Sequence, residues 1–133
     1  MQRFLDYFPN SERAKQAQDI IFELQDKLVY KELLNAQLYY NLGNYMGNNY
    51  QSAIITAQNA LKEYPYTRYK ETLSMLILKS KYQEAVQSIE EKKPERFRDV
   101  IDEYYSFIND YPSGEYSKEA ENIFKVANKY VKD

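Results

Sequence analysis

The sequence contains no cysteine and no histidine, and each absence excludes a class of chemistry. Without cysteine there is no disulfide, no thiolate metal site and no cysteine nucleophile. Without histidine the chain lacks a common metal ligand and the usual general base near neutral pH. No stretch approaches the roughly 18 consecutive apolar residues of a membrane-spanning helix. We therefore expect a protein that is not an enzyme and that needs no cofactor.

The charged residues are nearly balanced, with 18 basic and 20 acidic side chains and a net charge of −2. A nucleic-acid-binding surface needs a concentrated basic face, so no nucleic-acid partner is expected. The basic residues at 92–98 are interleaved with acidic ones, which favours a solvated turn between helices over an anion site. Only three glycines are present, and none belongs to a phosphate-binding loop.

One phrase of eight residues occurs three times, at residues 4–11, 60–67 and 107–114. It reads FLDYFPNS, ALKEYPYT and FINDYPSG, with an aromatic residue directly before each proline. Because the residue before a proline is pushed out of the α-helical region, each phrase should end a helix. Apolar residues lie 8, 11 and 12 positions after each proline, on one face of a following helix. The phrase therefore predicts a helix, a turn at the proline and a second helix.

The spacing of the phrases is longer than that of the tetratricopeptide repeat (TPR), which recurs every ~34 residues. Pro9 and Pro65 are 56 residues apart, and Pro65 and Pro112 are 47 residues apart. The excess lies in the first helix of each pair. Residues 12–42 contain no glycine or proline and should form one continuous helix, because nothing near Tyr30, the alternative breakpoint, terminates a helix.

This helix carries two apolar stripes, which predicts packing against neighbours on both sides. One stripe comprises Ala14, Ala17, Ile21, Leu24, Leu28, Leu38 and Leu42. The other comprises Phe22, Val29, Leu33, Ala36, Tyr40 and Gly43.

The remaining helices follow from turn signals and apolar spacing. The glycine- and asparagine-rich segment 43–49 predicts a turn, after which a helix begins at Asn49, with Ala53 and Ala60 at close helix crossings. A long helix is expected over residues 67–91, with Ile89 on its buried face. Pro94 suits the first turn of the next helix, and the last helix should span about residues 115–131.

The expected fold is all-α: an α-solenoid of TPR-like helical hairpins with unusually long first helices. It forms a single TPR-like domain over residues 1–133, with about two and a half repeats. Residues 4–9 form the tail of a repeat with no partner helix before it, whereas a solenoid needs a capped end. We therefore expect the chain to be the C-terminal fragment of a longer protein.

Two groups of residues are candidates for binding another protein. Tyr45 and Tyr66 lie in turns, and tyrosine is enriched in binding surfaces because it joins a large apolar body to a hydroxyl group. Ile55 points outward in the phase that Ala53 and Ala60 define, and Thr56 and Asn59 lie beside it.

The order and unequal spacing of these phrases resemble the BamD family, the TPR lipoproteins of the outer-membrane β-barrel assembly machine. The resemblance covers nearly all the chain and matches the C-terminal part of that family. Its most specific feature is the long first helix ending in a pair of tyrosines. The residues that carry it are Tyr7-Phe8-Pro9-Asn10-Ser11, Leu24-Gln25-Asp26-Lys27-Leu28, Ala36-Gln37-Leu38-Tyr39-Tyr40 and Tyr64-Pro65-Tyr66-Thr67.

The resemblance implies a non-catalytic scaffold at the periplasmic face of the outer membrane of a Gram-negative bacterium. Its implied partners are the POTRA region of BamA and other subunits of the machine. Position in the family places Thr56 and its neighbours near the BamA contact. The lipid anchor that would hold it at the membrane is N-terminal and absent from this chain.

The alternative function is a free-standing TPR module that binds peptides, as an adaptor or chaperone does. Such a module should line its concave groove with lysine, arginine and asparagine. The inner helices here offer mostly tyrosine, leucine and alanine, with scattered Lys31 and Lys79, which favours the scaffold.

Overall fold

The computed structural model describes residues 12–131. This part of the chain contains five α-helices, joined by turns and loops, and no strand. The all-α class is thereby confirmed, whereas the first repeated phrase, at residues 4–11, lies outside the described residues. The helices are α2 (Glu12–Leu42), α3 (Asn49–Glu63), α4 (Lys70–Val86), α5 (Lys93–Asp110) and α6 (Ser117–Val131).

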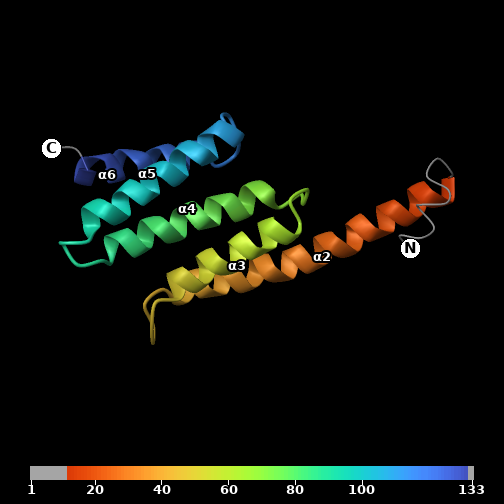
Figure 1. The fold of residues 1–133 in the computed structure, drawn as a ribbon, viewed down its shortest axis with the longest axis horizontal. Coiled ribbons are helices and arrows are strands. Elements are labelled where there is room, and N and C mark those ends of the chain that lie inside the picture. Colours follow the sequence, from red (N-terminus) through yellow and green to blue (C-terminus); the bar gives the residue numbers. More distant parts are fainter. Residues whose placement is uncertain (1–11, 132–133) are drawn as a thin grey trace.

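Each helix packs against the next one along the chain, so that the helices form successive hairpins (Figure 1). Two apolar clusters hold them together. The first joins α2 and α3 to one side of α4, and the second joins the other side of α4 to α5 and α6. Leu73 and Ile77 belong to the first cluster, while Met75 and Leu78 belong to the second. Because α4 buries apolar residues around most of its circumference, it is the element common to both halves.

The prediction that residues 12–42 form one helix is confirmed, because α2 runs without a break from Glu12 to Leu42. At 1.5 Å per residue it is ~46 Å long, about twice the length of α3. Figure 1 shows that α3 pairs with the C-terminal half of α2, while the N-terminal half extends beyond it. In the stripe that begins at Phe22, Val29, Leu33 and Ala36 are buried in the first cluster as predicted, whereas Phe22 is exposed.

The second and third phrases adopt the same turn. Tyr64 ends α3 with φ −129° and ψ 68°, and Tyr111 ends α5 with φ −135° and ψ 65°. The N–H of Tyr64 donates to the carbonyl of Ala60 at 2.9 Å, and that of Tyr111 donates to Phe107 at 2.8 Å. Both helices therefore end within the repeated phrase, as the sequence predicts, and the tyrosine before each proline is the C-cap.

The prediction of one helix over residues 67–91 is wrong at both ends, because α4 spans only Lys70–Val86. At the start, the Thr67 hydroxyl accepts a bond from the N–H of Tyr69, which holds a turn. At the end, Ser88 donates its hydroxyl to the carbonyl of Glu84 at 2.6 Å. Ile89 consequently lies in the turn after α4 and is exposed rather than buried.

The loop between α2 and α3 depends on backbone with positive φ. Gly43 has φ +57° and is buried against Tyr50, so that an added Cβ would lie 2.7 Å from the tyrosine oxygen. Asn48 then caps α3, its side chain accepting from the N–H of Gln51 at 3.2 Å. This cap fixes the start of α3 at Asn49, as predicted.

Substitution of Ala53 by leucine should destabilise the protein by about 1–3 kcal/mol, because Ala53 is completely buried and the larger side chain overpacks the helix crossing. Urea unfolding measures the change. Leucine at exposed Gln58 on the same helix is the control and should be nearly neutral. Equal stability of the two variants would contradict this packing.

Alkaline pH should also weaken the fold. Burial raises the pKa of Tyr40, Tyr104 and Tyr111 above the usual value of 10.0. These hydroxyls ionise more readily in the unfolded chain, so the free energy of unfolding should fall as the pH rises past about 10. Urea unfolding at about pH 8 and about pH 11 measures this fall, which Tyr111→Phe should reduce. A fall of the same size in Tyr111→Phe would show that Tyr111 contributes nothing.

Candidate partner-binding surface

The candidate surface starts on the side of α3 that faces away from its alanines. Ala53, Ala57 and Ala60 are buried, which leaves Ile55 and Asn59 on the outer side. Ile55 is 47% exposed, as the phase of the repeat predicts. Thr56 is half-buried beside it. These three residues form one strip on α3, which we call the outer strip.

The two candidate tyrosines lie at opposite ends of α3 and not beside the outer strip. Tyr45 belongs to the loop before α3 and Tyr66 to the turn after it, and both are exposed. Since α3 has 15 residues, it separates the two by ~22 Å along its axis. The five sequence candidates thus form a strip of three residues with one tyrosine beyond each end.

Tyr66 borders a groove of about 230 Å³ between α2 and the turn after α3. Phe22 contributes an apolar wall, although the sequence had assigned it to a packed stripe. It stays about half exposed because α3 ends at Glu63, so only turn residues lie near it. The complete lining is Phe22, Gln25, Asp26, Glu63, Tyr64, Pro65, Tyr66 and Thr67.

Asp26 ties this turn to α2. Its Oδ2 atom accepts a bond from Nε of Arg68 at 3.0 Å, and its Oδ1 atom accepts one from the Thr67 hydroxyl at 3.4 Å. The side chain of Asp26 is mostly buried, whereas that of Arg68 is largely exposed. Sequence reasoning missed this contact because its members are 41 and 42 residues apart, with no local pattern to connect them.

A second groove, of about 240 Å³, lies between α3, α4 and α5 and is mainly polar. It carries charges of both signs, and its two cations already have partners. Lys81 pairs with Glu103 at 2.9 Å, and Nη1 of Arg96 donates to Ser88 at 2.8 Å. The groove is lined by Gln51, Ile54, Gln58, Lys81, Glu84, Arg96 and Asp99.

The two lysines considered for a peptide-binding groove do not line one together. Lys31 is exposed on α2. Lys79 on α4 is half-buried, with its ammonium group 5.1 Å from the centre of the Tyr40 ring and 3.8 Å from Glu119. They therefore supply no shared cationic clamp.

Within residues 12–131 no cluster of three or more carboxylates is arranged to hold a metal ion. In that same part of the chain no helix is long and apolar enough to cross a membrane. The sequence matches no protein-family model, and a search of curated proteins finds no match.

Substitution of Asp26 by alanine should lower the free energy of unfolding by about 1 kcal/mol, because it removes both bonds between α2 and the turn. The exposure of Arg68 keeps the effect modest. Glu23→Ala on the same helix is the control, since its 3.9 Å pair with Lys27 is solvent-exposed. If both variants unfold at the same urea concentration, the Asp26 contacts do not stabilise the turn.

Proposed function

We propose that this chain is a non-catalytic scaffold that holds another protein through the outer strip of α3. The observation that carries the proposal is the exposure of Ile55. The opposite side of α3 is packed through fully buried alanines, so the fold itself makes no use of a branched apolar side chain on the outer side. A large apolar side chain flanked by Thr56 and Asn59 has the composition of an interface centre with a polar rim.

The proposal includes a TPR-like solenoid as the architecture. Its support is the recurrence of one turn at Tyr64–Thr67 and at Tyr111–Gly114, together with the shared position of α4 between two clusters. In a solenoid each repeat contacts its neighbours, which leaves extended helical faces free for partners. The proposed repeat differs from a standard TPR in that its first helix, α2, is about twice as long as its second helix, α3.

The partner that we propose is the POTRA region of BamA, at the periplasmic face of the outer membrane. The support is the resemblance of the sequence to the BamD family. In this role the chain would help to assemble β-barrel proteins into the outer membrane, beside other subunits of the machine.

A peptide-binding adaptor is the second candidate, and the polar groove between α3, α4 and α5 is the observation in its favour. Binding of a peptide carboxylate there would have to displace the contacts of Lys81 and Arg96, and Glu84 and Asp99 would repel it. The outer strip of α3 needs no such rearrangement, so we prefer the scaffold.

Substitution of Ile55 by glutamate tests the proposal. The variant should fold normally, because Ile55 lies outside both clusters. It should bind a purified POTRA fragment at least about tenfold more weakly, because a charge enters an apolar contact worth about 2 kcal/mol. Isothermal titration measures the affinity, and circular dichroism checks folding.

Asn122→Asp is the control, because it adds a negative charge at an exposed position of α6, which does not contact α3. Equal affinity of the folded Ile55 and Asn122 variants would remove the outer strip from the interface. No binding by the unsubstituted chain would reject BamA as the partner.

A further inference from the structure

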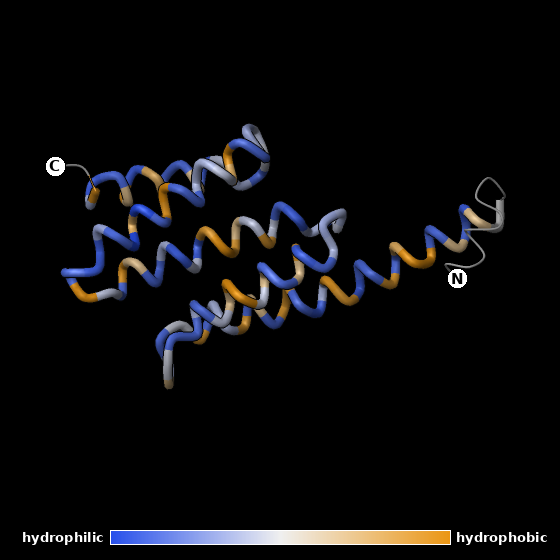
Figure 2. Tube along the Cα trace, in the orientation of Figure 1, coloured by the Kyte–Doolittle hydropathy of each residue, from blue (hydrophilic) through white to orange (hydrophobic). Residues whose placement is uncertain are grey.

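A second apolar surface runs along α2 on the side away from α3. Leu24, Leu28, Leu38 and Leu42 are each between 41% and 57% exposed. The sequence predicts that this stripe packs against a neighbour, but no described helix covers these leucines. Figure 2 shows hydrophobic segments recurring along α2, including the part that extends beyond α3.

The positions on this surface follow the spacing of a coiled-coil seam. Residues 24, 28, 31, 35, 38 and 42 are separated alternately by four and three residues. That alternation keeps side chains on one stripe facing a partner helix. Four of the six positions are leucine, and the two central ones, Lys31 and Asn35, are exposed and polar. We call these six residues the free face.

The pattern of apolar and polar positions on the free face is the same in both directions, with the two polar positions in the middle. In an antiparallel pair of two α2 helices, leucine would meet leucine in every apolar layer. Leu24 would face Leu42 of the second copy, and Leu28 would face Leu38. Lys31 would face Asn35, whose side-chain oxygen can accept a bond from an ammonium group. In a parallel pair Lys31 would instead face its own copy, and the two positive charges would repel each other.

We infer that the free face is the contact surface for a second copy of this chain, with the two α2 helices antiparallel. Such an interface uses the same patch on both subunits and closes on itself as a symmetric dimer. The polar layer at Lys31 and Asn35 fixes the register, since any shift would place a polar side chain against leucine.

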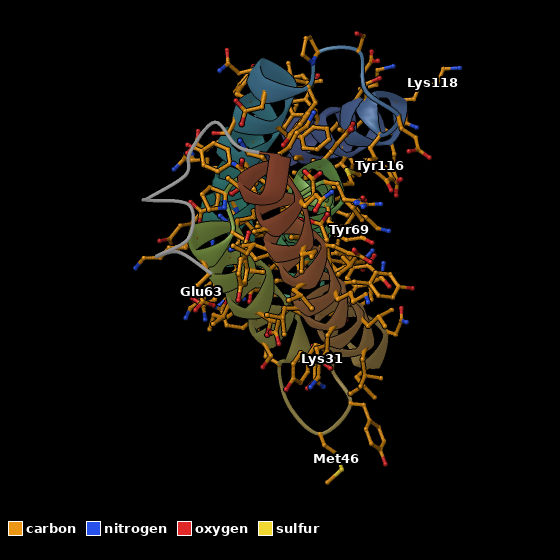
Figure 3. The ribbon with its side chains drawn as sticks, turned by 90° about the vertical axis from the view of Figure 1, so that its right-hand side faces the viewer. Lys31, Met46, Glu63, Tyr69, Tyr116 and Lys118 are labelled. Carbon is orange, nitrogen blue, oxygen red and sulfur yellow. The ribbon has the colours of Figure 1, made fainter. Side chains whose placement is uncertain are left out.

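Two neighbouring features fit this arrangement. Leu34 is exposed beside the centre of the free face, where it would lie close to Leu34 of the second copy. Met46 lies in the loop that follows the C-terminal end of α2, and it is 90% exposed. Figure 3 shows its loop projecting beyond the helices. In an antiparallel pair this loop would lie near Ile20 of the second copy, which is also exposed.

Engineered cysteines test the pairing directly, because the chain has no native cysteine. A mixture of Leu28→Cys and Leu38→Cys chains should form a mixed disulfide dimer under mild oxidation. Either variant alone should cross-link poorly, because identical positions would be 10 residues, or about 15 Å, apart along the seam. Predominant Leu28→Cys homodimers would contradict the antiparallel register.

Sedimentation equilibrium of the unsubstituted chain measures dimerisation without cross-linking. A monomer at tens of micromolar would overturn the inference. Leu28→Glu should weaken the dimer at least about tenfold, because it places a charge in an apolar layer. Gln37→Glu, an exposed position of α2 outside the free face, is the control and should leave the dimer intact.

The dimer contact on α2 and the partner contact on α3 can be tested separately. Ile55→Glu changes α3 and should leave dimerisation unaltered. Weakening of the dimer by Ile55→Glu as large as that by Leu28→Glu would assign the contact to α3 and contradict the use of the free face.

Discussion

The close packing of α3 between α2 and α4 is the contact on which the rest of the structure depends. Ala53, Ala57 and Ala60 are buried there, and side chains this small let helix backbones approach one another. The contact holds the first cluster together, and α4 then carries the second cluster on its other side. Because the small residues are confined to one side of α3, its outer side remains available to a partner. The need to pack small side chains on one side of α3 thus determines that Ile55 lies on the exposed side.

Packing on only one side of α2 leaves the other distinctive surface exposed. α3 covers one side of the C-terminal half of α2, and the leucines on the opposite side remain in water (Figure 1). An apolar stripe of this kind is stabilised when it is removed from water, whether by another subunit or by a second copy. We infer the second copy from the polar pair in its centre, because antiparallel self-pairing matches Lys31 with Asn35 and leucine with leucine. We propose that the two surfaces serve different contacts on adjacent helices.

The parts of the fold that local chemistry determines could be predicted from the sequence. The tyrosine–proline pairs correctly marked the ends of α3 and α5, and the uninterrupted spacing correctly indicated one helix for α2. The limits of α4 were missed because Thr67 and Ser88 form hydrogen bonds to nearby backbone, which periodicity does not register. Phe22 was wrongly predicted to be packed, because the apolar stripe of α2 that contains it continues beyond the point where α3 ends. For the candidate surface, repeat phase predicted the exposure of Ile55, whereas the Asp26–Arg68 contact depends on tertiary structure alone.

We propose that α3 and α2 present two separate surfaces, one for a partner and one for a second copy. Methyl-resolved NMR of the isotopically labelled chain tests both in one set of spectra. The Ile55 methyl signals should shift on addition of the POTRA fragment. The methyl signals of Leu28 and Leu38 should shift on dilution of the chain alone. Ile55 signals that stay unchanged on addition of the fragment would contradict partner binding by α3. Leu28 and Leu38 signals that stay unchanged on dilution would contradict pairing through the free face.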